Sequence, residues 1–229
     1  MSSNFHSVRL DAEKCKGCTN CIKRCPTEAI RVHDGKATII EERCIDCGEC
    51  IRSCPNHAKF AVTDNLDKLS AYKYTIALPA PSFFGQFKNQ EHIEDILHAF
   101  LRLGFNEVFE VALAAEIVGY IVHRHLMADH VKKPLFSSAC PAVLRLMQIK
   151  FPDLLKQCAP VLTPMEVAAR LAKEEAIKKT GLSYDEIGTI FISPCPAKVT
   201  EVKHPMATNH SEVDGVIGAN LIFRNILKE

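Results

Sequence analysis

The chain has 229 residues, of which 47% are hydrophobic and 24% are charged, and its formal net charge is +1. This length suits one large domain or two smaller ones, with enough apolar material for a core. The near-neutral charge argues against a nucleic-acid partner, which would need a basic patch. The longest apolar stretch, 111–122, is broken by Glu116 and is too short to span a bilayer. No signal-peptide core is present at the N-terminus, so we expect a cytoplasmic protein without a membrane partner.

Two cysteine runs occupy the first quarter of the chain, and both have the spacing C-x2-C-x2-C-x3-C-P. The first run contains Cys15, Cys18, Cys21 and Cys25, and the second contains Cys44, Cys47, Cys50 and Cys54. A disulfide framework is not expected in a reducing cytosol. Zinc sites usually combine C-x2-C units with a long spacer. The spacing is that of bacterial iron–sulfur proteins, and it predicts iron–sulfur ligation.

In proteins with two such runs, the fourth cysteine of each run binds the other cluster. The predicted ligands are therefore Cys15, Cys18, Cys21 and Cys54 for cluster one, and Cys44, Cys47, Cys50 and Cys25 for cluster two. The repeat extends beyond the cysteines at an offset of 29 residues, for example from Ala29 to Ala58. A short strand is predicted before each run, and a helical turn after it, over 26–30 and 55–59. Residues 8–63 thus resemble a bacterial two-cluster ferredoxin, and we expect an α+β ferredoxin-like two-cluster domain over residues 1–65.

The remainder of the chain alternates between strand and helix patterns. After a polar linker at 64–71, strands are predicted at 74–78, 108–111, 133–137 and 187–192, and helices at 93–101, 112–127 and 142–149. A further helix should begin at Thr163, whose side chain and Glu166 form a capping box, and end at Gly181. This alternation predicts an α/β domain with a mainly parallel sheet over residues 66–229.

Three cysteines lie outside the two runs. Cys140 and Cys195 each precede a proline, and both are expected at the carboxyl ends of strands, where sites form in such sheets. Cys140 also begins a helix, where the dipole favours a thiolate. Their residue type and position leave three roles open, which are metal ligand, buried inert cysteine and nucleophile. Cys158 is interpreted as a packing residue.

At these residues the chain resembles the catalytic domain of iron-only hydrogenases. The resemblance rests on P-A-P-S from Pro79, S-S-A-C-P from Ser137, T-P-M-E from Thr163, S-P-C-P-A-K from Ser193 and the segment 104–116. In that family a two-cluster ferredoxin domain precedes a domain that holds the H-cluster, a 4Fe–4S cubane joined to a diiron unit with CO and CN ligands. The resemblance implies that Cys140 and Cys195 are cubane ligands and that the ammonium of Lys198 binds a diiron cyanide. It also implies that Ala80 and Pro81 lie near the other cyanide; without the family, Lys198 would be read as a solvent-facing lysine.

The chain departs from the family pattern in three places. Ala139 stands where active members carry a proton-shuttling cysteine, and Ser193 stands where they carry methionine. In both respects the chain resembles the sensory or otherwise divergent branch of the family. The third signature, which supplies the two remaining cubane ligands, is absent, and no cysteine follows Cys195. We therefore expect a complete H-cluster only if a C-terminal segment or a second subunit supplies those ligands.

The leading prediction is the N-terminal portion of an iron-only hydrogenase-like, sensory protein. Two 4Fe–4S clusters would carry electrons to or from the H-cluster for reversible proton reduction to H₂. The alternatives are a non-catalytic ferredoxin-type electron carrier and a hydrogenase-like factor of iron–sulfur assembly. The expected partner is a redox protein, either a ferredoxin or a reductase.

Overall fold

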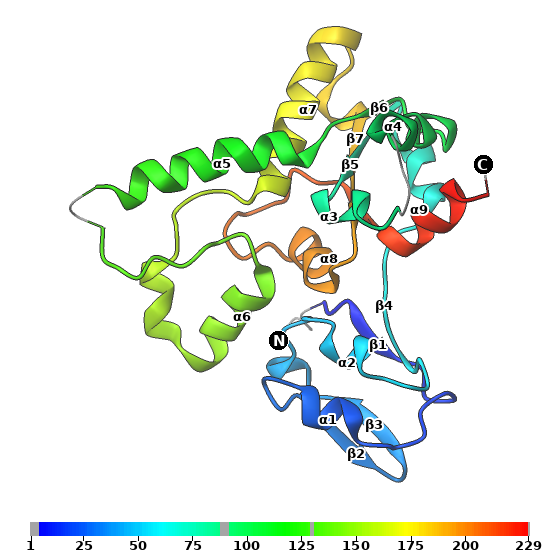
Figure 1. The fold of residues 1–229 in the computed structure, drawn as a ribbon, viewed down its shortest axis with the longest axis vertical. Coiled ribbons are helices and arrows are strands. Elements are labelled where there is room, and N and C mark those ends of the chain that lie inside the picture. Colours follow the sequence, from blue (N-terminus) through cyan, green and yellow to red (C-terminus); the bar gives the residue numbers. More distant parts are fainter. Residues whose placement is uncertain (1–4, 88–91, 129–130, 229) are drawn as a thin grey trace. The chain divides into compact units, whose positions relative to one another are not determined.

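The computed structural model describes residues 5–87, 92–128 and 131–228, which form two compact units (Figure 1). Unit 1 comprises Met1–Thr63, Cys140–Lys156 and Cys195–Met206, and unit 2 comprises Asp64–Ala139, Gln157–Pro194 and Ala207–Glu229. The division into domains 1–65 and 66–229 stays a prediction. Within the described ranges, no helix is both long enough and apolar enough to cross a membrane.

Unit 1 contains two small antiparallel strand pairs. The pairs are β1 (Val8–Leu10) with β4 (Lys59–Ala61), and β2 (Ile30–His33) with β3 (Lys36–Ile39). Asp34 and Gly35 connect β2 to β3, and both have positive φ, of 50° and 71°. A two-residue loop of left-handed residues matches the twist of paired strands, which explains the tight hairpin.

Each cysteine run has a short helix that contains its third cysteine and ends before its fourth. These helices are α1 (Asn20–Arg24) and α2 (Glu49–Arg52). The predicted helical turns over 26–30 and 55–59 are wrong, because the chain there makes a turn and enters β2 or β4. Glu28 and His57 have left-handed φ values of 54° and 49°, which a right-handed helix cannot contain. These two residues are 29 apart, so the repeat is visible in the backbone as well as in the sequence.

Unit 1 also contains two helices that come from the distant segments of the chain. They are α6 (Pro141–Lys150) and α8 (Pro196–Lys203), which contact each other. Each begins with proline at its first position, where a missing N–H costs nothing and the fixed φ suits the helix. The N-cap residues are Cys140 and Cys195, which confirms the predicted helix start at Cys140.

The sheet of unit 2 has four parallel strands in the order β6-β5-β7-β8. The strands are β5 (Tyr74–Pro79), β6 (Glu107–Val108), β7 (Ile187–Ser193) and β8 (Gly215–Gly218). The helices are α3 (Pro81–Phe84), α4 (Ile93–Arg102), α5 (Val111–Leu126), α7 (Pro164–Thr180) and α9 (Ala219–Ile226). Strands alternate with helices, so the predicted α/β class with a parallel sheet is confirmed.

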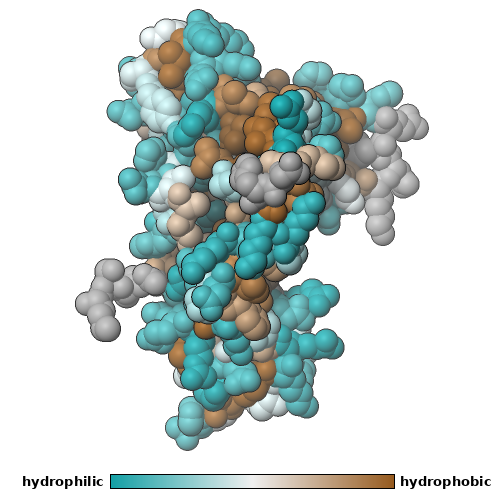
Figure 2. Space-filling view, turned by 90° about the vertical axis from the view of Figure 1, so that its left-hand side faces the viewer, coloured by the Kyte–Doolittle hydropathy of each residue, from teal (hydrophilic) through white to brown (hydrophobic). Residues whose placement is uncertain are grey.

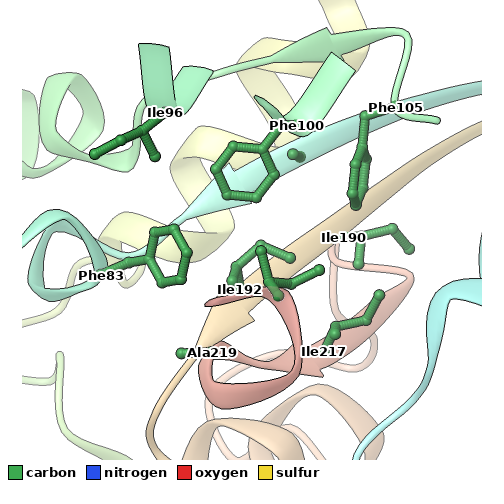
Figure 3. Close-up of a cluster of buried hydrophobic side chains, with 10 residues drawn as sticks. Phe83, Ile96, Phe100, Phe105, Ile190, Ile192, Ile217 and Ala219 are labelled. Atoms are coloured by element: carbon green, nitrogen blue, oxygen red, sulfur yellow. The ribbon is translucent and has the colours of Figure 1, made fainter. Parts of the chain in front are cut away.

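The core of unit 2 lies between β5, β7, β8 and the helices α3, α4 and α9 (Figure 3). Phe83, Phe100 and Phe105 converge there on aliphatic side chains of the sheet. The rings of Phe83 and Phe100 lie 5.5 Å apart. The neighbouring β5 and β7 are almost entirely buried, as expected for strands covered on both faces.

Four local expectations for unit 2 are corrected by the structure. The strand predicted at 108–111 is observed at Glu107–Val108, and Val111 already begins α5. Residues 133–137 form only an isolated bridge from Phe136 to Cys158, since Pro134 has no N–H for a ladder. Thr163 makes no capping bond, and the carboxylate of Glu166 instead accepts hydrogen bonds from Ser211 and Glu212. The polar stretch 64–71 is partly a 3₁₀ helix, Leu66–Ala71.

Helix α5 leaves an apolar face exposed. Leu113, Ile117, Tyr120 and Ile121 are all at least 45% exposed and recur at helical spacing. Figure 2 shows hydrophobic side chains at the surface among hydrophilic ones. The predicted apolar character of this helix is therefore not explained by burial within unit 2 alone.

Candidate iron–sulfur site

The first candidate site is a hollow in unit 1, which we call hollow one. Its cysteines are Cys15, Cys18, Cys21 and Cys54. Cys15 and Cys18 come from the loop that leads into α1, Cys21 lies in α1, and Cys54 follows α2. They are the four residues that the sequence predicts as ligands of cluster one.

Hollow two is a second hollow, also in unit 1. Its cysteines are Cys25, Cys44, Cys47 and Cys50. The fourth cysteine of each run therefore lines the hollow of the other run. This crossed arrangement is the one predicted for cluster two, and ligation itself stays a prediction.

Backbone N–H groups point at several of these sulfurs. The Ala29 N–H donates to Sγ of Cys25 at 3.2 Å, and the Ala58 N–H donates to Sγ of Cys54 at 3.3 Å. The two bonds are related by the offset of 29. A hydrogen bond to sulfur favours a thiolate over a thiol. The loops are thus built to carry negative charge on sulfur.

Burial has the opposite effect on the thiols of hollow two. It raises the pKa of Cys44 and of Cys50 to about 12, with the carboxylate of Asp46 adding to the shift at Cys44. At Cys15 in hollow one, the backbone N–H of Gly17 holds the thiol pKa below its usual range. A buried thiol loses its proton readily when a metal takes the proton's place. Four sulfurs around each hollow are the donor set of a 4Fe–4S cluster, so the residues fit that group.

The loop of hollow two contacts the segment that follows Cys195. Gly48 has φ of 76°, and a Cβ there would lie 3.1 Å from Cγ of Pro196. Ser7 strengthens the connection, because its hydroxyl donates to the Pro196 carbonyl at 2.7 Å and its N–H donates to Oγ1 of Thr200 at 3.2 Å. Both the left-handed backbone and the limited space beside Pro196 therefore favour glycine at position 48.

His6 and Asp46 were missed by the sequence reasoning. Nδ1 of His6 lies 2.7 Å from Oδ2 of Asp46, and both side chains are buried. Asp46 also accepts a 3.0 Å hydrogen bond from the Val8 N–H. Burial alone would raise the pKa of Asp46, but these bonds bring it below the usual value. The repeat held a signal, since Asp46 stands 29 residues after Gly17 in the same left-handed conformation.

The remaining predicted site residues fall in both units. Cys140 is exposed and Cys195 is partly buried, and both belong to unit 1. Lys198 is not solvent-facing, because its side chain is 13% exposed and its Nζ lies 2.8 Å from Oε2 of the buried Glu201. Its role toward a cyanide ligand stays a prediction.

The other predicted residues belong to unit 2. Ala80 is the N-cap of α3, Pro81 is the first residue of that helix, and the Ala80 N–H donates to the Ile192 carbonyl at 3.0 Å. They lie directly after β5, at its carboxyl end. Cys158 is half-buried in the bridge with Phe136, and burial raises the pKa of its thiol.

Family comparisons agree with this geometry. The family model for the "Iron only hydrogenase large subunit, C-terminal domain" matches residues 73–228, and the model for the "4Fe-4S dicluster domain" matches residues 7–55. The periplasmic Fe hydrogenase large subunit of Nitratidesulfovibrio vulgaris is 30% identical over 88% of this chain and 52% of its own length. The NADP-reducing hydrogenase subunit HndD of Solidesulfovibrio fructosivorans is 24% identical over 89% of this chain and 34% of its own length.

Solved structures show the same fold. An FeFe-hydrogenase from Chlamydomonas reinhardtii superposes with a TM-score of 0.56 at 22% identity, covering 71% of this chain and 46% of that chain. The chain thus spans about half, or less, of the length of the relatives that it matches. Because one family model covers more than half of the sequence and its fold agrees, the chain belongs to the iron-only hydrogenase family.

Proposed function

We propose that hollows one and two each hold one 4Fe–4S cluster and that unit 1 carries electrons one at a time between a redox partner and a site at Cys140 and Cys195. A 4Fe–4S cluster supplies one-electron chemistry when it is bound. The chain's own contribution is to supply four sulfurs for each cluster, to direct N–H groups at them and to bury them. These features support a ferredoxin-like two-cluster domain.

One observation carries the proposal. The loop of hollow two lies against Pro196, the residue after Cys195, through the contact at Gly48. The bonds from Ser7 to Pro196 and Thr200 fix this contact. Hollow two is thereby placed next to the helix whose N-cap is Cys195. This contact offers a protein route for an electron between hollow two and the segment at Cys195.

For the complete protein we propose the hydrogenase-type reaction, reversible reduction of protons to H₂, in a sensory role. This chain offers two cysteines, Cys140 and Cys195, where the family's cubane uses four, so two further ligands would have to come from elsewhere. Support for sensing comes from Ala139, whose methyl group cannot relay a proton, and from the buried Ser193 in place of methionine. Lys198 holds its ammonium in an ion pair with Glu201 at the start of α8.

Anaerobic reconstitution followed by iron analysis and EPR tests the two-cluster proposal. We expect about eight iron atoms per chain and the spectrum of two interacting reduced clusters. Cys50→Ala should remove about four iron atoms, whereas Cys158→Ala should leave the count unchanged. Colourless protein that binds zinc instead would disprove the proposal, and so would an unchanged iron count in Cys50→Ala.

A hydrogen assay on the same material addresses the alternative of a non-catalytic electron carrier or assembly factor. After chemical reduction with dithionite, the chain alone should pass electrons to an electron-accepting dye without evolving hydrogen, because its two lone thiolates cannot complete the family's centre. Cys195→Ala should then leave both the iron count and dye reduction unchanged. Hydrogen evolution by this chain would contradict that expectation and favour a complete catalytic site.

A further inference from the structure

The wall of hollow one contains a buried lysine whose ammonium has no hydrogen-bond partner among the described residues. Lys59, the first residue of β4, is 3% exposed. Among the described residues, its Nζ atom is buried without a partner. An ammonium group held away from water needs a compensating negative charge. The negative groups that hollow one offers are the sulfurs of its cysteines.

The internal repeat shows what Lys59 replaces. The residue 29 positions earlier is Ile30, which begins β2, is 2% exposed and lines hollow two. Both residues follow an alanine whose N–H donates to a cysteine sulfur. Equivalent positions of the two hollows therefore have the same backbone arrangement. At one of these positions, hollow one has a positively charged lysine where hollow two has an isoleucine.

The other charged residues of the two walls follow the same asymmetry. Hollow one is lined by Lys16 and Lys59, with no acidic residue among its lining residues. Hollow two is lined by Asp46 and Glu49, with no basic residue among its lining residues. Lys16 is exposed and is screened by water, whereas Lys59 and Asp46 are buried. Lys59 is thus the buried cation in the wall of hollow one, whereas the buried charged residue in the wall of hollow two is the acidic Asp46.

The charge of Lys59 reaches sulfurs of both hollows, but more of them in hollow one. It opposes the burial effect that raises the pKa of Cys21 and of Cys50. It also adds to the backbone hydrogen bonds that lower the pKa of Cys15. Cys15 and Cys21 belong to hollow one, and Cys50 belongs to hollow two.

We propose that Lys59 makes the cluster of hollow one the higher-potential member of the pair, so that an electron rests there rather than at hollow two. This inference rests on the proposed two-cluster function. Reduction adds one electron and no proton, so a reduced cluster carries one more negative charge, which a nearby cation stabilises and a nearby anion destabilises. The transfer is balanced, since hollow two loses the electron that hollow one gains. Because hollow two is the one beside Pro196, Lys59 favours electron flow away from Cys195.

An EPR-monitored redox titration of the reconstituted full chain tests the proposal. The wild type should show two separate one-electron steps. Lys59→Met, which keeps the side-chain length and removes the charge, should shift the higher-potential step at least tenfold toward the oxidised form, a fall of about 59 mV for one electron. Lys59→Ile introduces the residue that hollow two has at the equivalent position, and it should lower the same potential by a similar amount. Lys59→Arg keeps the positive charge and should keep the wild-type potential.

Matched variants assign the effect to a site. Lys16→Met removes an exposed lysine from the same wall and should shift the step much less than Lys59→Met. In a Cys47→Ser background, in which only hollow two has a changed ligand, the step that responds to Lys59→Met should belong to the unaltered signal of hollow one.

The outcomes separate this inference from the function on which it rests. An iron count well below eight in the wild type would defeat the two-cluster function itself. A full iron count in Lys59→Met with both potentials unchanged, or with only the lower step moved, would overturn the role of Lys59 alone. Loss of iron from Lys59→Met and Lys59→Ile, but not from Lys59→Arg, would also overturn it, because the charge would then serve assembly and not potential.

Discussion

Units 1 and 2 differ in what fills their interiors. The buried cluster of unit 1 consists of Cys15, Cys21, Ile30, Ala37 and Ala58, so it includes predicted metal ligands and otherwise small side chains. The cluster of unit 2 contains three phenylalanines and four isoleucines around a four-stranded sheet, together with a fifth isoleucine in α9. Small domains with little apolar core commonly depend on a metal for stability. The comparison predicts that unit 1 depends on bound iron for its stability, whereas burial of apolar surface stabilises unit 2.

Withholding iron should produce the largest effect and should act on unit 1 alone. Without metal, eight sulfurs line two hollows with no bond between them, and the strands of unit 1 have three or four residues each. Hydrogen exchange of iron-free chain should show loss of protection in β1 and β4, with β5 and β7 still protected. Equal loss of protection in both units would contradict the division.

Truncating the core of unit 2 should give the next largest effect. Phe100 is fully buried, and Phe100→Ala should lower the free energy of unfolding of unit 2 by about 3–5 kcal/mol. Urea unfolding monitored by hydrogen exchange in β5 measures this loss, and the iron count should not change. The adjacent Leu101 is 44% exposed, so Leu101→Ala serves as the control with a change near zero. A lower iron count in Phe100→Ala would show that the two interiors depend on each other.

A surface charge of unit 2 should give the smallest effect, and this effect depends on pH. The ammonium of Lys73, with the N–H and hydroxyl of Ser183, holds the pKa of Glu186 at about 2, below the usual 4.5. A carboxyl group whose pKa is depressed by folding stabilises the fold above its unfolded pKa, and the contribution disappears as the pH falls through the folded value. Glu186→Gln should therefore lower the Tm of unit 2 slightly at neutral pH. The difference from wild type should shrink below about pH 4.5, and a constant difference would contradict the assignment.

Much of the site could be predicted because its signals are local. The spacing of the cysteines, the proline after Cys140 and the glycine at position 181 each act within a few residues. The structure accordingly has the expected cysteines around each hollow, α6 starting at Pro141 and α7 ending before Gly181. Strand β7 also follows its apolar run closely.

The errors arose where distant residues decide the local structure. Glu166 could not be assigned from its capping-box position, because its carboxylate bonds to residues about 45 positions away. The buried pair of His6 and Asp46 joins residues 40 apart. Strand β8 has only four residues, two of them glycine, and it is recognisable only beside β7. The unusual charge at Lys59 is visible in the sequence, because the equivalent position of the first repeat holds the aliphatic Ile30.

The three-part make-up of unit 1 has a consequence for synthesis of the protein. Both cysteine runs leave the ribosome early, but Pro196 and Thr200, which bind Ser7, are translated after three quarters of the chain. Proteins generally fold from the N-terminus as they emerge. Unit 1 is therefore complete only after residue 206 has emerged, and until then the two cysteine runs lack these later partners. The interval between those two events is when oxygen or a competing metal has its best access to the thiols.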